Sequence, residues 1–228
     1  NTLIIYRELY QKGLFFVCSK PFKNEALNVH LIHYIRSMTS PEYLFSFLLK
    51  KFPKQIKNLE NQKKKICKFY TYDKEKNAII KYFFNFVVKK ITLKKIITEL
   101  FKTKKLSKKK FLHKTYMNER DLKQLIHKGH YLGLHGHSHN PLNKINQKIN
   151  LDLEINKKIL KKITGIKRFK FFAYPYGRNH ALPKNLKRFQ EKQKIDFCFT
   201  MNKGINKKSF EKFNIKRINP NEINQYIK

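Results

Sequence analysis

Three histidines occupy the seven-residue segment GLHGHSH, residues 133–139, of a chain that holds only nine histidines. His135 and His139 stand four apart. Neutral imidazole nitrogens at this spacing can bind one zinc ion from a tight turn or a helical start. Two glycines permit close backbone approach there, and Pro141 stiffens the exit from the segment. The alternative is a polar loop with chance histidines. The segment therefore predicts half of a metal site.

Alternating helix and strand patterns surround this segment. Short apolar runs predict strands at LFFV (14–17), HYLGLH (130–135), FKFFAY (169–174), IDFCFT (195–200) and FNIKRIN (213–219). Periodic apolar residues predict helices at 2–12, 118–129, 146–165 and 184–194. This alternation is typical of a parallel sheet or an α/β barrel, in which the loops after the strands carry the chemistry. The histidine segment and the loop PYGRNHALP (175–183) both follow a predicted strand.

The stretch from about residue 25 to 115 differs from the rest of the chain. It is rich in lysine and mostly helical in pattern, with a clear helix at LKKIITELFK (93–102). Pro41 and Pro53 interrupt the pattern, because proline cannot continue a helix. We interpret this stretch as a helical insertion or cap.

Several segments together resemble one family. GLHGHSHNPLN is similar to the H-[ST]-x-x-H region of NodB-type polysaccharide deacetylases (carbohydrate esterase family 4), and FFAYPYG (171–177) resembles their R-x-P-Y-G motif. Residues 6–17, the long helix with Glu154 and residues 216–223 resemble neighbouring segments of that family. The resemblance implies an irregular (β/α) barrel that lacks its first strand. Residues 1–228 would form a single N-terminally truncated domain, with the helical insertion at about 25–115 inside it.

The resemblance also implies roles for individual residues. His135 and His139 match the metal ligands, whereas His137 falls on a variable position. Tyr176 matches the residue whose backbone N–H helps to stabilise the oxyanion. Pro175 and Gly177 shape that loop and are substrate-side candidates, as is His180 just beyond it.

The implied activity is that of a metal-dependent hydrolase acting on non-peptide C–N bonds. Its substrate would be an N- or O-acetylated polysaccharide or glycolipid sugar. Zinc is the expected ion, because a site with open coordination positions polarises a carbonyl and lowers the pKa of a bound water. A carbohydrate-binding relative without catalysis is the main alternative.

Three features depart from the family pattern. The T-F-D-D-G motif, which supplies the catalytic base and the third ligand, is absent, and none of the four aspartates replaces it. We expect the motif before residue 1, since the chain begins without Met. Ala173 stands where the family often has arginine, and no general-acid histidine follows Arg217. His30 and His33 are candidates for half-buried structural residues or for the rim of the substrate site.

The net charge of +37 raises the alternative of a nucleic-acid-binding protein. However, 45 lysines accompany only seven arginines, and no recognition module is visible. Lysine, asparagine, isoleucine, phenylalanine and tyrosine have AT-rich codons, so genome composition explains part of the excess. We therefore interpret the lysines as a solvated coat, with electrostatic contact to an anionic polymer or membrane surface as an alternative, and expect no specific nucleic-acid partner.

The cysteines and apolar runs bear on the cellular setting. Cys18, Cys67 and Cys198 are scattered, which argues against a disulfide framework and fits a reducing compartment. The longest apolar stretch, residues 79–88, is shorter than the roughly 20 residues that span a bilayer. A cytoplasmic or membrane-peripheral location is the expectation, although a signal cannot be assessed without the upstream residues.

Overall fold

The computed structural model describes residues 11–144 and 148–225. The chain forms two compact units. Residues 1–25 and 115–228 form the first, which we call the sheet unit, and residues 26–114 form the second, the helical unit. The predicted helix over residues 2–12 lies, apart from its last two residues, outside the described part of the chain.

The sheet unit is built on a parallel sheet whose strand order follows the chain order. Its strands are β1 (Leu14–Val17), β2 (Tyr131–Leu134), β3 (Phe171–Ala173), β4 (Phe197–Lys203) and β5 (Ile215–Arg217). Each neighbouring pair runs parallel. Because the strands are parallel, their carboxyl ends meet at one edge of the sheet. The loops that carry the histidines and the PYG segment both leave from that edge.

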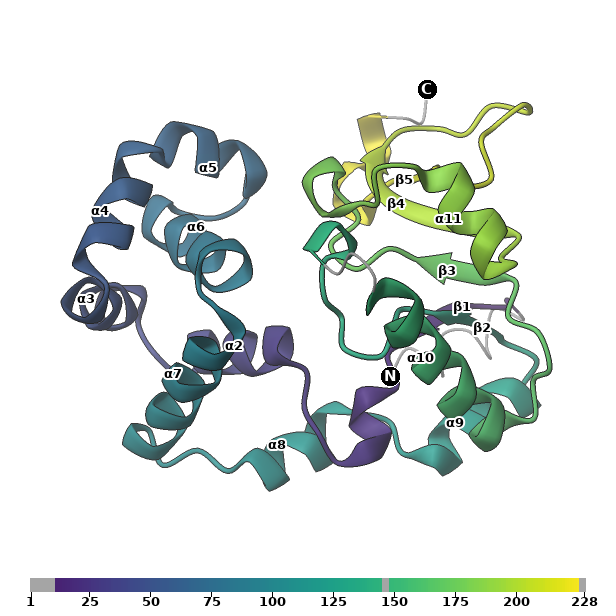
Figure 1. Cartoon of the computed structure of the whole chain (residues 1–228), viewed down its shortest axis with the longest axis horizontal. Helices are drawn as coiled ribbons and strands as arrows, with labels where there is room; N and C mark the ends of the chain where they lie inside the picture. The colour runs from purple at the N-terminus through teal and green to yellow at the C-terminus, as the bar shows by residue number, and fades with distance from the viewer. Residues whose placement is uncertain (1–10, 145–147, 226–228) are drawn as a thin grey trace. The chain divides into compact units, whose positions relative to one another are not determined.

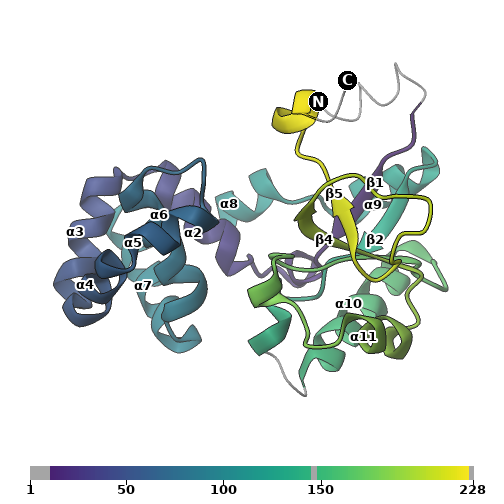
Figure 2. The same cartoon turned by 90° about the horizontal axis from the view of Figure 1, so that it is seen from above.

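Three helices cover one face of this sheet (Figures 1 and 2): α9 (Glu119–His127), α10 (Lys148–Thr164) and α11 (Leu186–Gln193). A single cluster of buried side chains joins them to the strands. It includes Leu122 of α9, Leu160 of α10, Phe189 of α11 and Phe172 of β3. Alternate strand residues contribute to the cluster, as the two-residue period of a strand requires. Short 3-10 turns complete the unit at Lys20–Lys23, Leu142–Lys144, Asn179–Ala181 and Pro220–Gln225.

Helix α9 begins where the sequence predicts, because two side chains at its amino end cap the backbone reciprocally. The Asn118 side chain accepts hydrogen bonds from the backbone N–H groups of Arg120 (2.8 Å) and Asp121 (3.0 Å). The Asp121 carboxylate in turn accepts from the backbone N–H of Asn118 at 2.9 Å. This reciprocal capping box satisfies backbone donors that a helix start leaves without partners.

The helical unit has its own apolar core. Its α-helices are α2 (Asn28–Ser37), α3 (Pro41–Lys51), α4 (Pro53–Asn61), α5 (Lys63–Phe69), α6 (Glu75–Tyr82), α7 (Lys90–Thr103) and α8 (Lys108–Thr115), with a π-helical segment at Phe83–Val87. Pro41 and Pro53 each occupy the first turn of a helix, where the missing N–H costs nothing. Ile35, Leu48 and Leu100 are at most 1% exposed and belong to the core of this unit.

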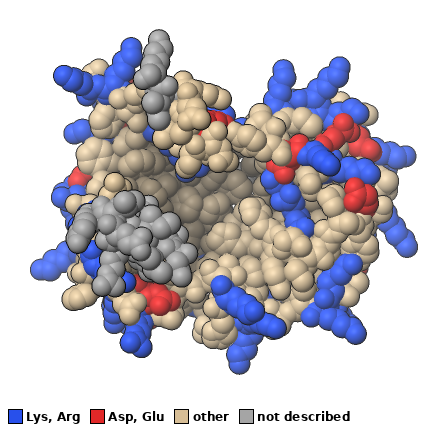
Figure 3. Space-filling model, turned by 180° about the vertical axis from the view of Figure 1, so that it is seen from behind, with Lys and Arg blue, Asp and Glu red and all other residues tan. Residues whose placement is uncertain are grey.

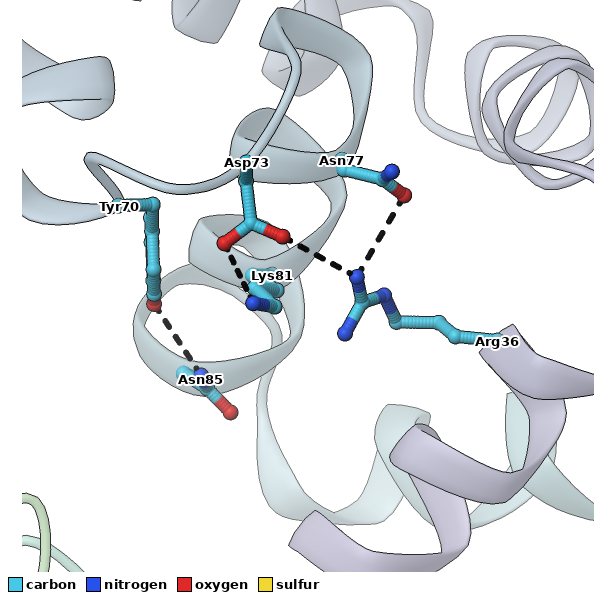
Figure 4. Close-up of polar contacts among 6 residues, drawn as sticks. All are labelled: Arg36, Tyr70, Asp73, Asn77, Lys81 and Asn85. Atoms are coloured by element: carbon cyan, nitrogen blue, oxygen red, sulfur yellow. Dashed lines mark hydrogen bonds and ion pairs between the residues drawn. The ribbon is translucent and has the colours of Figure 1, made fainter. Parts of the chain in front are cut away.

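A largely buried ion-pair network ties α2 to α6 inside the helical unit (Figure 4). Asp73 accepts from Lys81 Nζ at 2.5 Å and from Arg36 Nη2 at 3.5 Å. Arg36 Nη2 also lies 3.5 Å from Asn77 Oδ1. Only 15–22% of the Asp73, Arg36 and Lys81 side chains is exposed. Burial lowers the pKa of the Arg36 guanidinium, and the negative charge of Asp73 opposes this effect.

The predicted parallel α/β class is confirmed by the five paired strands. Among the described residues the sheet is open, with β1 and β5 at its edges, so closure into a barrel stays a prediction. The helical unit spans nearly the range of the predicted insertion, while its place within one larger domain also stays a prediction. No described helix is long and apolar enough to cross a membrane.

Candidate active site

His135 directly follows β2 at the carboxyl edge of the sheet. Its backbone N–H donates to the Val17 carbonyl at 3.3 Å, which continues the pairing with β1. Its ring Nδ1 lies 2.8 Å from the carbonyl oxygen of Ala173, at the end of β3. A carbonyl can only accept, so Nδ1 carries the proton and Nε2 of the neutral ring keeps its lone pair. A histidine that ligates a metal is typically oriented by such a bond.

His139 is brought beside His135 by a left-handed turn. His139 has φ +53° and Gly136 has φ +75°, so the loop reverses within four residues. The two imidazole centroids are 4.7 Å apart with the rings at 79°. The Tyr176 ring from the opposite loop packs 5.0 Å from the His139 ring. Two of the predicted ligands and the predicted oxyanion residue therefore lie together at one place.

The PYG loop depends on its glycine. Tyr176 and Gly177 both have positive φ, +62° and +53°. The Gly177 carbonyl accepts from the Met201 N–H at 2.7 Å. A Cβ at Gly177 would lie 2.8 Å from that same nitrogen, so a larger residue would displace β4 or the loop. Pro175 is buried. This arrangement fixes the Tyr176 backbone at the carboxyl edge.

His180 lies beyond this loop, in the 3-10 turn Asn179–Ala181. The side chain of Asn143, which follows the histidine loop, donates to the His180 carbonyl. This bond joins the segment that follows the histidine loop to the segment that follows the PYG loop. His30 and His33, by contrast, lie on α2 of the helical unit, where burial lowers the pKa of each ring.

His137 is engaged with the end of β1. Its Nδ1 lies 2.9 Å from Ser19 Oγ, and its carbonyl accepts from the Lys20 N–H at 3.1 Å. Burial lowers the pKa of the His137 ring, and the negative charge of Asp152 opposes that shift. Nearby, the Cys18 thiol donates to the His135 carbonyl at 3.2 Å, and its own burial raises the Cys18 pKa. The residues that follow β1 thus hold the histidine loop through hydrogen bonds to His135 and His137.

Asp152 is a positioning residue that the sequence reasoning missed. From the second turn of α10, its carboxylate accepts from the backbone N–H groups of His137 (2.7 Å) and Ser138 (3.1 Å). A Cβ at position 136 would lie 2.8 Å from Asp152 Oδ2, so the close approach of this carboxylate requires glycine at that position. The only signal in the sequence is an acid near the start of the helix after the loop. Asp152 therefore holds the segment between the two candidate ligands.

Replacing Asp152 by asparagine tests this role. The asparagine amide has only one acceptor oxygen, so its NH₂ group would face a backbone N–H that the carboxylate accepts from in the native protein. We expect exchange of the His137 and Ser138 amide protons to accelerate about tenfold or more, since charge-assisted bonds are worth roughly 1.5–3 kcal/mol. Glu154→Gln, two residues further along α10 and 60% exposed, is the matched control and should leave both rates unchanged. Equal exchange in both variants would show that Asp152 does not hold the loop.

The described residues supply two of the ligands that a zinc site needs. His135 offers Nε2, and the adjacent His139 ring offers a second imidazole, which fits the donor chemistry of zinc. Among the described residues, no group of three His, Cys, Asp or Glu side chains gathers where it could hold a metal ion. The pair therefore fits part of a site and not a complete one.

Each aspartate in the chain already has a structural partner. Asp73 pairs with Arg36 and Lys81, and Asp121 caps α9. Asp152 holds the histidine loop, while Asp196 pairs with Arg168 just before β4, at the amino edge of the sheet. None of the four is thus placed by the structure as the base beside the histidine pair.

The comparisons with known proteins bear on this geometry. The family described as polysaccharide deacetylase matches residues 60–194, which is more than half of the chain. The matched range contains the histidine loop, Asp152 and the PYG loop. Residues 6–17 and 216–223 lie outside it, so their resemblance to family segments stays a prediction. No curated protein and no solved structure matches the chain significantly.

Proposed function

We propose that this chain, which belongs to the polysaccharide deacetylase family, removes acetyl groups from an N- or O-acetylated polysaccharide or glycolipid sugar with the help of a divalent metal ion, with zinc as the expected ion. One observation carries the proposal. His135 and His139 lie side by side at the carboxyl edge of a parallel sheet, with the PYG loop against them. That edge is where parallel α/β folds place their reactive groups.

His135 and His139 would hold the ion through their imidazole nitrogens. When bound, the ion polarises the acetyl carbonyl and lowers the pKa of a water molecule. The Ala173 carbonyl keeps His135 in the tautomer that leaves Nε2 available. Asp152 holds the backbone between the two histidines and thereby sets the direction of His139. These contacts preorganise the pair, so that little rearrangement is needed at the moment of reaction.

The Tyr176 backbone N–H would stabilise the negative charge that develops on the acetyl carbonyl oxygen when water attacks the carbonyl carbon. A preorganised donor of this kind contributes about 3–4 kcal/mol. Its place is set by the left-handed conformation of Tyr176 and Gly177 and by the bond from Met201 to the Gly177 carbonyl. Pro175 and Gly177 would shape the loop on the substrate side, and His180 would line the site beyond them.

We infer that no aspartate of these 228 residues supplies the general base and third ligand, because they contain no Asp-Asp pair. Each of the four aspartates makes other contacts, and Asp152 binds the backbone of the histidine loop, so none supplies this pair.

The engagement of every aspartate also favours a second candidate, a relative that binds carbohydrate without hydrolysing it. The protein expressed from its complete reading frame separates the two functions. Incubation with an acetylated chito-oligosaccharide should release acetate in an enzyme, whereas a binding relative would retain the oligosaccharide with its acetyl groups intact. Binding without acetate release, in the presence of added zinc, would overturn the hydrolase proposal.

A further inference from the structure

A basic groove in the sheet unit is lined by α10 and α11, which hydrogen bonds from Lys157 to Gln193 join. Its cavity volume is about 540 Å³, which is within the usual range for ligand sites. Phe169 stands just before β3 and Lys194 just before β4. The groove therefore opens at the amino edge of the sheet, away from the loops of the candidate active site.

Most of the residues that line the groove are cationic. Seven of the ten lining residues are lysine or arginine and one is acidic: Glu154, Lys157, Lys158, Lys161, Lys167, Arg168, Phe169, Lys192, Gln193 and Lys194. The positive charges come from three separate segments, which are the second half of α10, the residues before β3 and the end of α11. The fold thus concentrates lysines that are far apart in the sequence.

Two of these cations are used by the fold itself. Lys157 Nζ lies 2.8 Å from Glu154 Oε1 and donates to Gln193 at 3.1 Å, which ties α10 to the buried end of α11. Arg168 pairs with Asp196. Charged side chains therefore hold the two walls of the groove together.

The other five lysines are exposed and form no ion pair among the described residues: Lys158, Lys161, Lys167, Lys192 and Lys194. The carboxyl ends of α10 and α11 point into this region, and each carries about half a negative charge. Two such half charges balance roughly one of five ammonium groups. The groove therefore keeps a strong positive potential that an anionic ligand would neutralise.

The kind of anionic ligand is limited by the aromatic content, the shape and the basic side chains of the groove. Phe169, the only aromatic residue of the lining, is 6% exposed, so nucleobases find no surface on which to stack. The groove is concave, so a flat membrane surface reaches its walls poorly. Lysine ammonium groups act as separate point charges, which suits a row of phosphates better than a single planar carboxylate.

We propose that this groove binds a soluble ligand that carries several linked phosphate groups and no stacking bases. The competing interpretation is the general lysine coat of a chain with net charge +37. Figure 3 shows Lys and Arg side chains spread over the face it draws rather than gathered in one patch. The effect of the groove can be separated from that of overall charge, because α8 carries exposed lysines that do not line this groove.

The experiment compares two triple variants of equal charge. K161A/K167A/K192A removes three exposed groove lysines, and K109A/K110A/K114A removes three exposed lysines of α8. The probe is inorganic polyphosphate at about 0.15 M salt, where long-range surface effects are screened. We expect binding to weaken at least tenfold in the groove variant and less than twofold in the α8 variant. Unchanged thermal midpoints in both variants establish that each is folded.

Two further probes distinguish the sources of phosphate. A single-stranded oligonucleotide and vesicles of anionic phospholipid are titrated against the same variants. Equal losses in both triple variants, or no polyphosphate binding by the unmodified protein, would overturn the proposal. Tighter groove-dependent binding of the oligonucleotide or the vesicles would also overturn it, because bases or a lipid surface would then be the ligand.

Discussion

His139→Ala is expected to lower the affinity of the protein for zinc by at least about 100-fold, because it removes one of two imidazole ligands from an already incomplete site. The His135 and His139 rings lie 4.7 Å apart and approach each other at nearly a right angle. Neither ring alone can hold a divalent ion against water. Zinc affinity is measured by calorimetry, with cobalt as a spectroscopic substitute.

The matched control for this prediction is His137→Ala. His137 lies between the two candidate ligands in the sequence, but its ring contacts Ser19 at 2.9 Å. Its removal should change zinc affinity by less than about fivefold, which is the range of an indirect effect on the loop. If His137→Ala weakens zinc binding as strongly as His139→Ala, the assignment of the ligand pair is wrong.

The second large effect concerns the stability of the helical unit. Asp73→Asn should cost about 3 kcal/mol, because breaking a buried ion pair leaves uncompensated charge behind. Asparagine keeps the shape of the side chain and removes the charge that Lys81 and Arg36 contact (Figure 4). Hydrogen exchange of the α2 and α6 amides measures the local effect, and about 3 kcal/mol corresponds to an acceleration of roughly two orders of magnitude.

Glu99→Gln is the control for Asp73→Asn. Glu99 pairs with Lys51 at 2.8 Å, but the two side chains are 44% and 39% exposed. Exposed pairs contribute about 0.2–1 kcal/mol, so this variant should change exchange by less than about fivefold. Similar acceleration in both variants would mean that burial of the Asp73 network does not determine its contribution.

The elements of the sheet unit could be predicted because their signals are local. LFFV between Gly13 and a polar segment predicts β1 to the residue. The periodic apolar residues of 118–129 predict α9, which the structure places at Glu119–His127. Strand β4 was predicted at 195–200 but runs from Phe197 to Lys203, because its end pairs with β5 through polar residues that carry no apolar alternation.

The candidate site was predictable only in part, for a related physical reason. The paired histidines and the PYG loop are short motifs, and both follow strands. The contacts that hold them join residues far apart in the chain, as Asp152 with the His137 amide and His135 with the Ala173 carbonyl. Such pairs leave no periodic trace in a sequence. The groove lysines were likewise indistinguishable from the general lysine coat before the fold brought α10 and α11 together.

The release of acetate by histidine variants tests the central claim most directly. The protein from its complete reading frame is supplied with zinc and an acetylated chito-oligosaccharide, and His135→Ala is compared with His137→Ala. Loss of a metal ligand should reduce turnover by at least about a thousandfold, since metal activation of the carbonyl supplies several kcal/mol. His137→Ala should retain most activity. Undiminished turnover in His135→Ala would contradict the assignment of the active site.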